Sequence, residues 1–160
     1  MQWSEVLEHK ELQDLPFKIE LNEWGNIVMS PASNRHAFIQ TMLANLIDRR
    51  KKEGFVLTEC SIGTSRGVKV ADVIWGSDDF FSRNGLVTPY SIAPEVCIEV
   101  LSPSNTMKEM IEKKELYFAR GAREVWLCKE SGEMIFFDNH GEIARSGILE
   151  EIPVVLHIAI

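Results

Sequence analysis

The 160-residue sequence has few basic residues, few cysteines and no long apolar run. Its 17 lysines and arginines are outnumbered by 24 aspartates and glutamates, which gives a net charge of −7. This balance argues against a general nucleic-acid coat, because such proteins gain affinity from each phosphate that a basic side chain neutralises. No apolar run approaches the roughly 20 residues that cross a bilayer, and the charged N-terminal stretch does not resemble a signal peptide. We therefore expect a cytoplasmic protein with no membrane segment.

The three cysteines point to the same compartment. Cys60, Cys97 and Cys128 lie in separate apolar segments, without a CxxC pair or a cluster of histidine and cysteine. Unpaired, reduced thiols are typical of the cytosol, and the spacing argues against structural zinc. The length suits one hydrophobic core, so residues 1–160 are expected to form a single domain.

Apolar periodicity and turn residues predict both helices and strands. One helix is predicted to begin at Ser33 or Asn34 and to stop at Gly54. A second is predicted between the capping box that starts at Thr106 and the stop at Gly121. The predicted strands are two short ones within 15–31, joined by a turn at 22–26, and then 55–62, 68–76, one within 94–104, 123–130, 132–143 and 152–160, the last being a strand or an edge segment.

The order of these elements predicts the fold class. A helix connects the strand within 94–104 to the strand at 123–130, and such a crossover joins parallel neighbours. A loop is predicted at 76–89. This βαβ-like crossover within an otherwise strand-rich order predicts that the sheet is mixed. We expect an α/β protein with a mixed sheet and a helix packed on each face.

Two carboxylates interrupt apolar strands. Asp72 lies in "VKVADVIWG" and Glu99 in "PEVCIEVLSPS", and the apolar neighbours predict that both strands are central. Buried acids on adjacent strands repel each other unless one takes up a proton or a cation lies between them. Mg²⁺ prefers oxygen ligands of this kind and keeps waters for substrate phosphates. The alternatives for each acid are a place at a sheet edge, a partner lysine or arginine, or a role in capping a loop.

The helix after Glu99 carries two lysines that could approach these acids. On a helical wheel Lys114 lies near the centre of the apolar arc, whereas Lys113 lies at its edge, one turn from Tyr117. Either ammonium group could instead reach solvent past its apolar stem. His36, at the start of the first long helix, is a substrate contact, a supporting residue or only a surface or capping group.

The segments "VADV", "PEVCIEVLSPS" and "EKKELYFARGAREVWLC" together resemble the Uma-type putative restriction endonucleases, a branch of the PD-(D/E)XK nuclease superfamily. The resemblance covers nearly the whole chain. It implies a restriction-endonuclease-like mixed β-sheet flanked by α-helices, and a Mg²⁺- or Mn²⁺-dependent endonuclease acting on DNA. It also implies a homodimer, because cutting both strands suits a two-fold pair.

The resemblance also assigns roles to residues. Asp72 and Glu99 would bind the metal, with the backbone carbonyl of Val100 as a third ligand. The lysine that usually follows the glutamate by two residues is replaced here by Leu101, and counting back from Tyr117 and Gly121 places it at Lys113.

Three readings of function remain open. The first is the metal-dependent endonuclease, with Lys113 as the catalytic lysine and His36, Lys114 and Tyr117 as supporting residues. The second is a catalytically inactive nuclease fold that binds nucleic acid or a partner, which suits the acidic charge. The third, a serine hydrolase at "LSPS", is poorly supported because the motif has none of the glycines of a nucleophile elbow.

Overall fold

The computed structural model describes residues 1–159. The chain forms a six-stranded sheet, a separate two-stranded hairpin and four α-helices within that range. The helices are α1 (Trp3–Glu8), α2 (Asn34–Arg50), α3 (Asp78–Asn84) and α4 (Met107–Ala119), with a 3-10 turn η1 at Lys10–Leu12. The strands are β1 (Phe17–Leu21), β2 (Ile27–Pro31), β3 (Phe55–Thr64), β4 (Gly67–Gly76), β5 (Val96–Val100), β6 (Glu124–Cys128), β7 (Met134–Asp138) and β8 (Gly141–Ile143).

The large sheet has the strand order β3-β4-β5-β6-β7-β8. Only β5 and β6 run parallel, and α4 makes the crossover between them. The other neighbours are antiparallel. The predicted mixed sheet with central strands at Asp72 and Glu99 is therefore confirmed, since β4 and β5 each have a neighbour on both sides.

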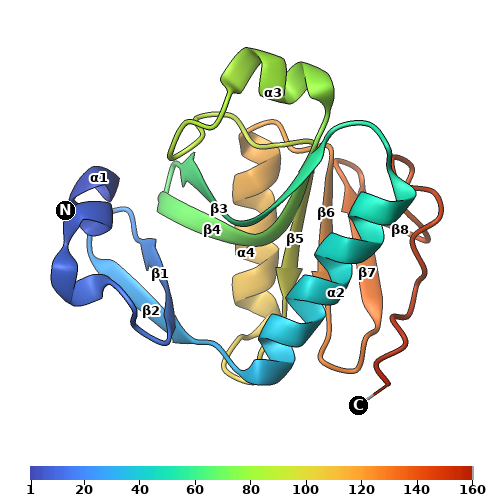
Figure 1. The fold of residues 1–160 in the computed structure, drawn as a ribbon, viewed down its shortest axis with the longest axis horizontal. Coiled ribbons are helices and arrows are strands. Elements are labelled where there is room, and N and C mark those ends of the chain that lie inside the picture. Colours follow the sequence, from blue (N-terminus) through green and yellow to red (C-terminus); the bar gives the residue numbers. More distant parts are fainter. Residues whose placement is uncertain (160) are drawn as a thin grey trace.

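Helices cover the two faces of this sheet, as Figure 1 shows. On one face, Ile39, Leu43 and Ile47 of α2 pack against alternate residues of β4 and β5, including Val73 and Ile98. Residues from the other face, joined by Tyr117 of α4, form a second apolar cluster. A helix on each face of the sheet, as predicted, encloses a core of fully buried side chains.

Local sequence signals set the start of both long helices and the end of α4, whereas α2 ends at Arg50, before the predicted stop at Gly54. Ser33 is the N-cap of α2, and its hydroxyl accepts a hydrogen bond from the backbone NH of His36. Thr106 and Glu109 form the predicted capping box of α4. Gly121 follows the end of α4 with φ of +101°, a backbone conformation that favours glycine.

The hairpin of β1 and β2 lies outside the large sheet, beside β4 (Figure 1). Its turn is stabilised by the side chain of Asn22, which accepts hydrogen bonds from the backbone NH groups of Trp24 and Asn26. This is the turn predicted at 22–26. The hairpin matters for function because β1 contributes side chains to the site described below.

Two local predictions were wrong. The loop predicted at 76–89 contains α3, which is capped by Ser77. The strand predicted at 132–143 is divided by a turn into β7 and β8. For the tail, predicted as a strand or an edge segment, the described residues 152–159 form an edge segment: Ile152 and Leu156 anchor it in the core, and one isolated bridge joins Val155 to Glu133.

Candidate metal-binding and active site

The ladder between β4 and β5 ends where the two acids begin. Its last antiparallel pair is Val73 with Ile98, and the next residues are Asp72 on β4 and Glu99 on β5. Asp72 is 0% and Glu99 2% exposed. The end of the pairing frees the backbone NH of Val100, which donates to Asp72 Oδ2 at 2.7 Å. Strand register therefore places the two carboxylates opposite each other at the point where the strands separate.

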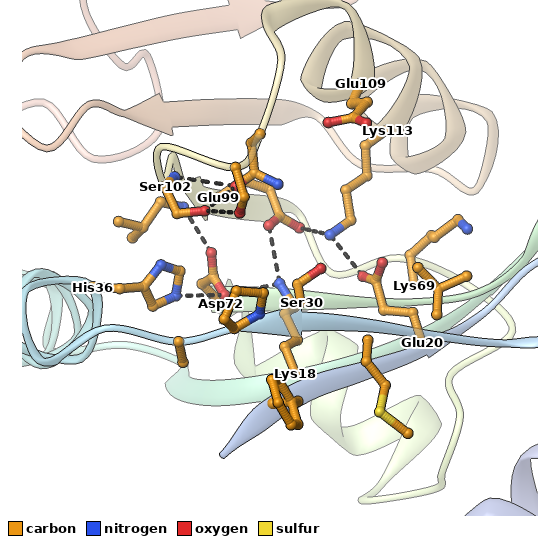
Figure 2. A pocket seen from close by; sticks show the side chains of 18 of the residues that line it. Lys18, Glu20, Ser30, His36, Lys69, Asp72, Glu99, Ser102, Glu109 and Lys113 are labelled. Atoms are coloured by element: carbon orange, nitrogen blue, oxygen red, sulfur yellow. Dashed lines mark hydrogen bonds and ion pairs between the residues drawn. The ribbon is translucent and has the colours of Figure 1, made fainter. Parts of the chain in front are cut away.

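Each carboxylate has one oxygen fixed by a neutral protein donor. Val100 holds Oδ2 of Asp72, and the hydroxyl of Tyr117 donates to Oε1 of Glu99 at 2.6 Å. The other two oxygens converge on one cation. Lys18 Nζ lies 2.8 Å from Asp72 Oδ1 and 3.1 Å from Glu99 Oε2, and Figure 2 shows this lysine between the two acids.

A second lysine joins Glu99 to a third acid. Lys113 Nζ lies 2.9 Å from Glu99 Oε1 and 2.7 Å from Glu20 Oε1. Glu20 is held in place by the backbone NH of Val70, which donates to the same oxygen at 2.7 Å. The result is a continuous chain of alternating charge from β1 through α4 to the acids of β5 and β4 (Figure 2).

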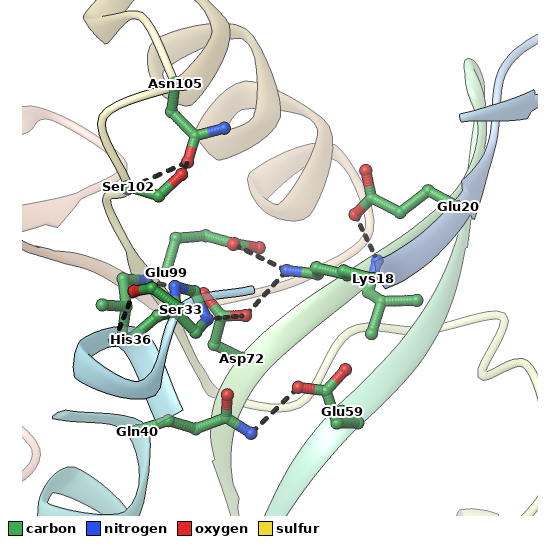
Figure 3. A network of polar contacts seen from close by, with 12 residues as sticks. Lys18, Glu20, Ser33, His36, Gln40, Glu59, Asp72, Glu99, Ser102 and Asn105 are labelled. Carbon is green, nitrogen blue, oxygen red and sulfur yellow. Dashed lines mark hydrogen bonds and ion pairs between the residues drawn. The ribbon is translucent and has the colours of Figure 1, made fainter. Parts of the chain in front are cut away.

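His36 and Lys114 lie in different places. His36 Nε2 is 3.2 Å from Asp72 Oδ1, so the start of α2 contributes directly to the cluster (Figure 3). Lys114 points away from it: its Nζ lies 2.8 Å from Glu115 and 4.6 Å from the ring centre of Phe137. Of the two neighbouring lysines, Lys113 is the one at the acids.

Burial and ion pairing oppose each other at the two central acids. At Asp72, burial favours the neutral form, but Lys18 and the bond to His36 outweigh it and hold the pKa well below the usual range. At Glu99, burial prevails over Lys113 and Lys18 and raises the pKa. The sheet therefore holds Asp72 as a firm anion beside a carboxyl group that takes up a proton more readily.

The surrounding residues respond to these charges. Burial lowers the pKa of Lys18, yet Glu99, Asp72 and Glu20 together raise it well above the ordinary value. Burial likewise works against ionisation of Glu20, but Lys113 and Lys18 lower its pKa. The hydrogen bond to Asp72 raises the pKa of His36. Lys18 therefore keeps its positive charge beside these acids.

The cluster opens into a cavity of about 760 Å³. Its walls include exposed apolar side chains of the hairpin, among them Phe17 and Met29, and the loop before α4 with Ser102. Asn105 fixes this loop by accepting hydrogen bonds from the backbone NH and the hydroxyl of Ser102 (Figure 3). The space admits a substrate group to the acids from one side.

The donor set suits a hard divalent cation. Asp72 Oδ1 and Glu99 Oε2 already point at one positive group, and Val100, whose carbonyl is the predicted third ligand, also lines the cavity. No group of three or more His, Cys, Asp or Glu within residues 1–159 could hold a metal. Mg²⁺ is commonly bound by one or two carboxylates and several waters, so this pair fits Mg²⁺ or Mn²⁺ and does not fit a closed structural zinc site.

Sequence reasoning missed Lys18 and Glu20. In "FKIEL" these two residues alternate with apolar ones, a pattern that ordinarily places polar side chains in solvent. They face the cavity because the hairpin lies beside β4. The sequence of the strand does not show this packing. Two opposite charges two residues apart on a strand are the only local signal, and it is a weak one.

A mixed sheet with acids on two central strands, at the point where these strands separate, and a lysine-bearing crossover helix is the arrangement that the resemblance implied. A sequence model of the Uma2 family, described as "Putative restriction endonuclease", matches residues 6–156. The chain belongs to this family. No curated protein matches the sequence.

The fold has a solved relative. A crystal structure described as a putative nuclease belonging to DUF820, from Anabaena variabilis ATCC 29413, superposes with a TM-score of 0.75 at 17% sequence identity. The match covers 97% of this chain and 94% of that one. At this identity the likeness establishes a shared fold. None of the helices within residues 1–159 combines the length and apolarity that crossing a bilayer requires.

Proposed function

We propose that this protein is a single-domain, Mg²⁺- or Mn²⁺-dependent endonuclease that hydrolyses phosphodiester bonds of DNA. The observation that carries the proposal is the convergence of Asp72 Oδ1 and Glu99 Oε2 on one cation, at the mouth of a cavity and beside Lys113. Membership of the family supports the reaction class. Reduced thiols and a cytoplasmic location suit such an enzyme.

In this proposal Asp72 and Glu99 hold the metal, with the carbonyl of Val100 as a further ligand. Bound there, a divalent cation polarises a phosphodiester and lowers the pKa of a bound water. Val100 NH and Tyr117 keep the two carboxylates in fixed orientation, so little reorganisation is required when substrate arrives.

Lys113 is the proposed catalytic lysine. Its ammonium group is fixed by Glu20 and Glu99, so it is positioned to orient the attacking water and to stabilise the negative charge that develops on the phosphate. His36 is a supporting residue that holds Asp72 from the α2 side. Lys114 has no role at the reacting group, because it lies over Phe137.

The second candidate function is binding without cleavage. It is favoured by the net charge of −7 and by the fact that protein lysines neutralise both acids in this structure. Such a protein would bind nucleic acid or a partner protein with little dependence on divalent ions.

The test is incubation of supercoiled plasmid with wild type, Asp72→Asn and Glu99→Gln in Mg²⁺, Mn²⁺ or EDTA. Asp138→Asn is the matched control, since Asp138 is a strand acid outside the cavity lining. We expect nicking or linearisation only by wild type and the control, and only with metal. Cleavage retained in either site variant would refute the assignment. Binding without cleavage in every condition would establish the second function.

Two parallel assays test the finer parts of the proposal. A single-stranded RNA of the same sequence should resist cleavage if DNA is the substrate. Light scattering should give twice the 18.2 kDa chain mass if the enzyme is a two-fold homodimer that cuts both strands.

A further inference from the structure

The ammonium group of Lys18 occupies the position between the two carboxylates where a metal ion would be bound. Its Nζ contacts one oxygen of each acid, 2.8 Å from Asp72 and 3.1 Å from Glu99. These are the two oxygens that are not held by Val100 or Tyr117. The lysine comes from the hairpin, whereas both acids come from the large sheet.

We propose that Lys18 is a built-in counterion of the metal site, and that its ammonium group must leave Asp72 and Glu99 before a divalent cation can bind. This inference rests on the proposed function, because it concerns the same site. It makes Lys18 a positioning residue that sets the affinity for metal and is not itself a ligand.

Joint occupancy is excluded by distance and charge. Mg²⁺ lies about 2.1 Å from its oxygen ligands, so a cation shared by Asp72 Oδ1 and Glu99 Oε2 would occupy the space that the Lys18 ammonium now fills. Two positive groups so close in a buried site also repel each other strongly. Binding of one therefore requires departure of the other.

The surroundings allow this exchange. The Lys18 side chain lies on the cavity wall and is 13% exposed, so its flexible stem can swing the ammonium group into the open space. Glu20 on the same strand attracts it there, as the rise in the Lys18 pKa already reflects. Lys113 does not need to move, because it binds the other oxygen of Glu99.

Without metal, Lys18 prevents two buried carboxylates from repelling each other. With Lys18 replaced, the same repulsion between the carboxylates increases the affinity of the site for a divalent cation. The proposal therefore predicts opposite effects of one substitution: lower stability in EDTA and higher affinity for a divalent ion.

The experiment is isothermal titration of Ca²⁺ and, in a second series, of Mn²⁺ into wild type, Lys18→Met and Lys69→Met, with thermal unfolding in EDTA and in Ca²⁺. Lys69 is the matched control, because it lines the same cavity but donates to the backbone oxygen of Leu21 at 3.3 Å. We expect Lys18→Met to bind Ca²⁺ at least about tenfold more tightly than wild type, as expected when a close competing charge is removed. Lys69→Met should change the affinity by less than about threefold, as expected for a more distant charge.

Each outcome is decisive. Equal or weaker binding by Lys18→Met, or an equal gain in both variants, overturns the proposal. Ca²⁺ binding by Lys18→Met and by neither wild type nor Lys69→Met supports the proposal most strongly. If no protein binds Ca²⁺ or Mn²⁺, the metal-dependent function fails, and the exchange fails with it.

A measurement on wild type covers the case in which Lys18→Met does not fold. Amine acetylation followed by peptide mass spectrometry reports how freely each lysine reacts. Ca²⁺ should increase acetylation of Lys18, which is released from its two partners, and should leave Lys114 unchanged. Ca²⁺ binding that leaves Lys18 equally or more protected would overturn the exchange.

Discussion

Replacing Lys113 by methionine should destabilise the protein far more than the same change at Lys114. The two neighbours on α4 are equally buried, at 8% and 9% exposure. Their partners differ: Lys113 contacts two buried carboxylates, Glu20 and Glu99, whereas Lys114 contacts an exposed acid and the rings of Phe118 and Phe137. Composition, helix position and the atoms removed are the same in both variants.

The magnitudes follow from these partners. Removing one member of a buried ion pair costs about 3–5 kcal/mol. The lower end applies to Lys113→Met, because Glu99 keeps Lys18 and Tyr117 as partners. Lys114→Met loses a cation–π contact of about 0.5–1 kcal/mol and a surface pair of little value.

Thermal unfolding followed by circular dichroism measures both variants. For a protein of this size 1 kcal/mol shifts the melting temperature by about 2–4 °C. We therefore expect a fall of roughly 6–12 °C for Lys113→Met and of roughly 1–4 °C for Lys114→Met, on the same relation. Equal losses, or a larger loss at Lys114, would show that the ion pairs of Lys113 contribute no more than generic helix packing.

Three further predictions concern pH, the core and the thiols. The pKa of His36 is raised above 6.5 by Asp72, so the contribution of His36 to stability is complete below about pH 6.5 and is lost as pH rises through its folded-state pKa. The free energies of unfolding at pH 6 and pH 9 should therefore differ less in His36→Gln than in wild type. An unchanged difference would contradict this. Glu124 is buried and accepts hydrogen bonds from Trp126, Ser146, Gly147 and Ile148. In Glu124→Gln the amide NH2 would face these donors, so the free energy of unfolding should fall by at least about 2 kcal/mol, against less than about 0.5 kcal/mol for Glu133→Gln at an exposed position. Similar losses of the two variants in chemical denaturation would contradict this. Burial raises the pKa of Cys60 and Cys128 to about 12, so a thiol reagent at pH 8 should leave these two thiols and the buried Cys97 unlabelled in the native protein and label all three in urea; rapid native labelling would contradict the buried placement.

The parts of the fold that the sequence predicted were those with a local signal. Ser33 and Thr106 are the caps of α2 and α4 because their side chains satisfy the first free NH groups of each helix. The parallel pairing of β5 and β6 followed from the intervening helix. Asp72 and Glu99 were recognisable because an acid within an apolar strand violates the burial pattern.

The errors have equally local causes. The α3 helix is short, and its two adjacent phenylalanines do not give helical spacing, so the acidic first turn after Ser77 was read as a loop. For the tail 152–160 the sequence left a strand and an edge segment open, and the described residues form the edge segment because Ile152 and Leu156 are used as separate anchors in the core. Which tail residues serve as anchors depends on the surface of the sheet against which they pack, and the sequence of the tail does not contain this information.

The choice between Lys113 and Lys114 shows the limit of the helical wheel. The wheel placed Lys114 near the centre of the apolar arc, and the structure places it there, over Phe137. Lys114, at the centre of the arc, packs over a ring of the core, whereas the acids lie where β4 and β5 separate. The edge position of Lys113 is the one that reaches them.

The division of the site between the large sheet and a separate hairpin has a consequence for its dynamics. Two-stranded hairpins have little stability alone, and proteins open locally where packing is least extensive. Detachment of β1 and β2 would carry Lys18 and Glu20 away together while Asp72, Glu99 and Lys113 stayed on the sheet and its helix. Amide hydrogen exchange in the hairpin therefore reports, without any substrate, how often the charges on the hairpin separate from those on the sheet and α4.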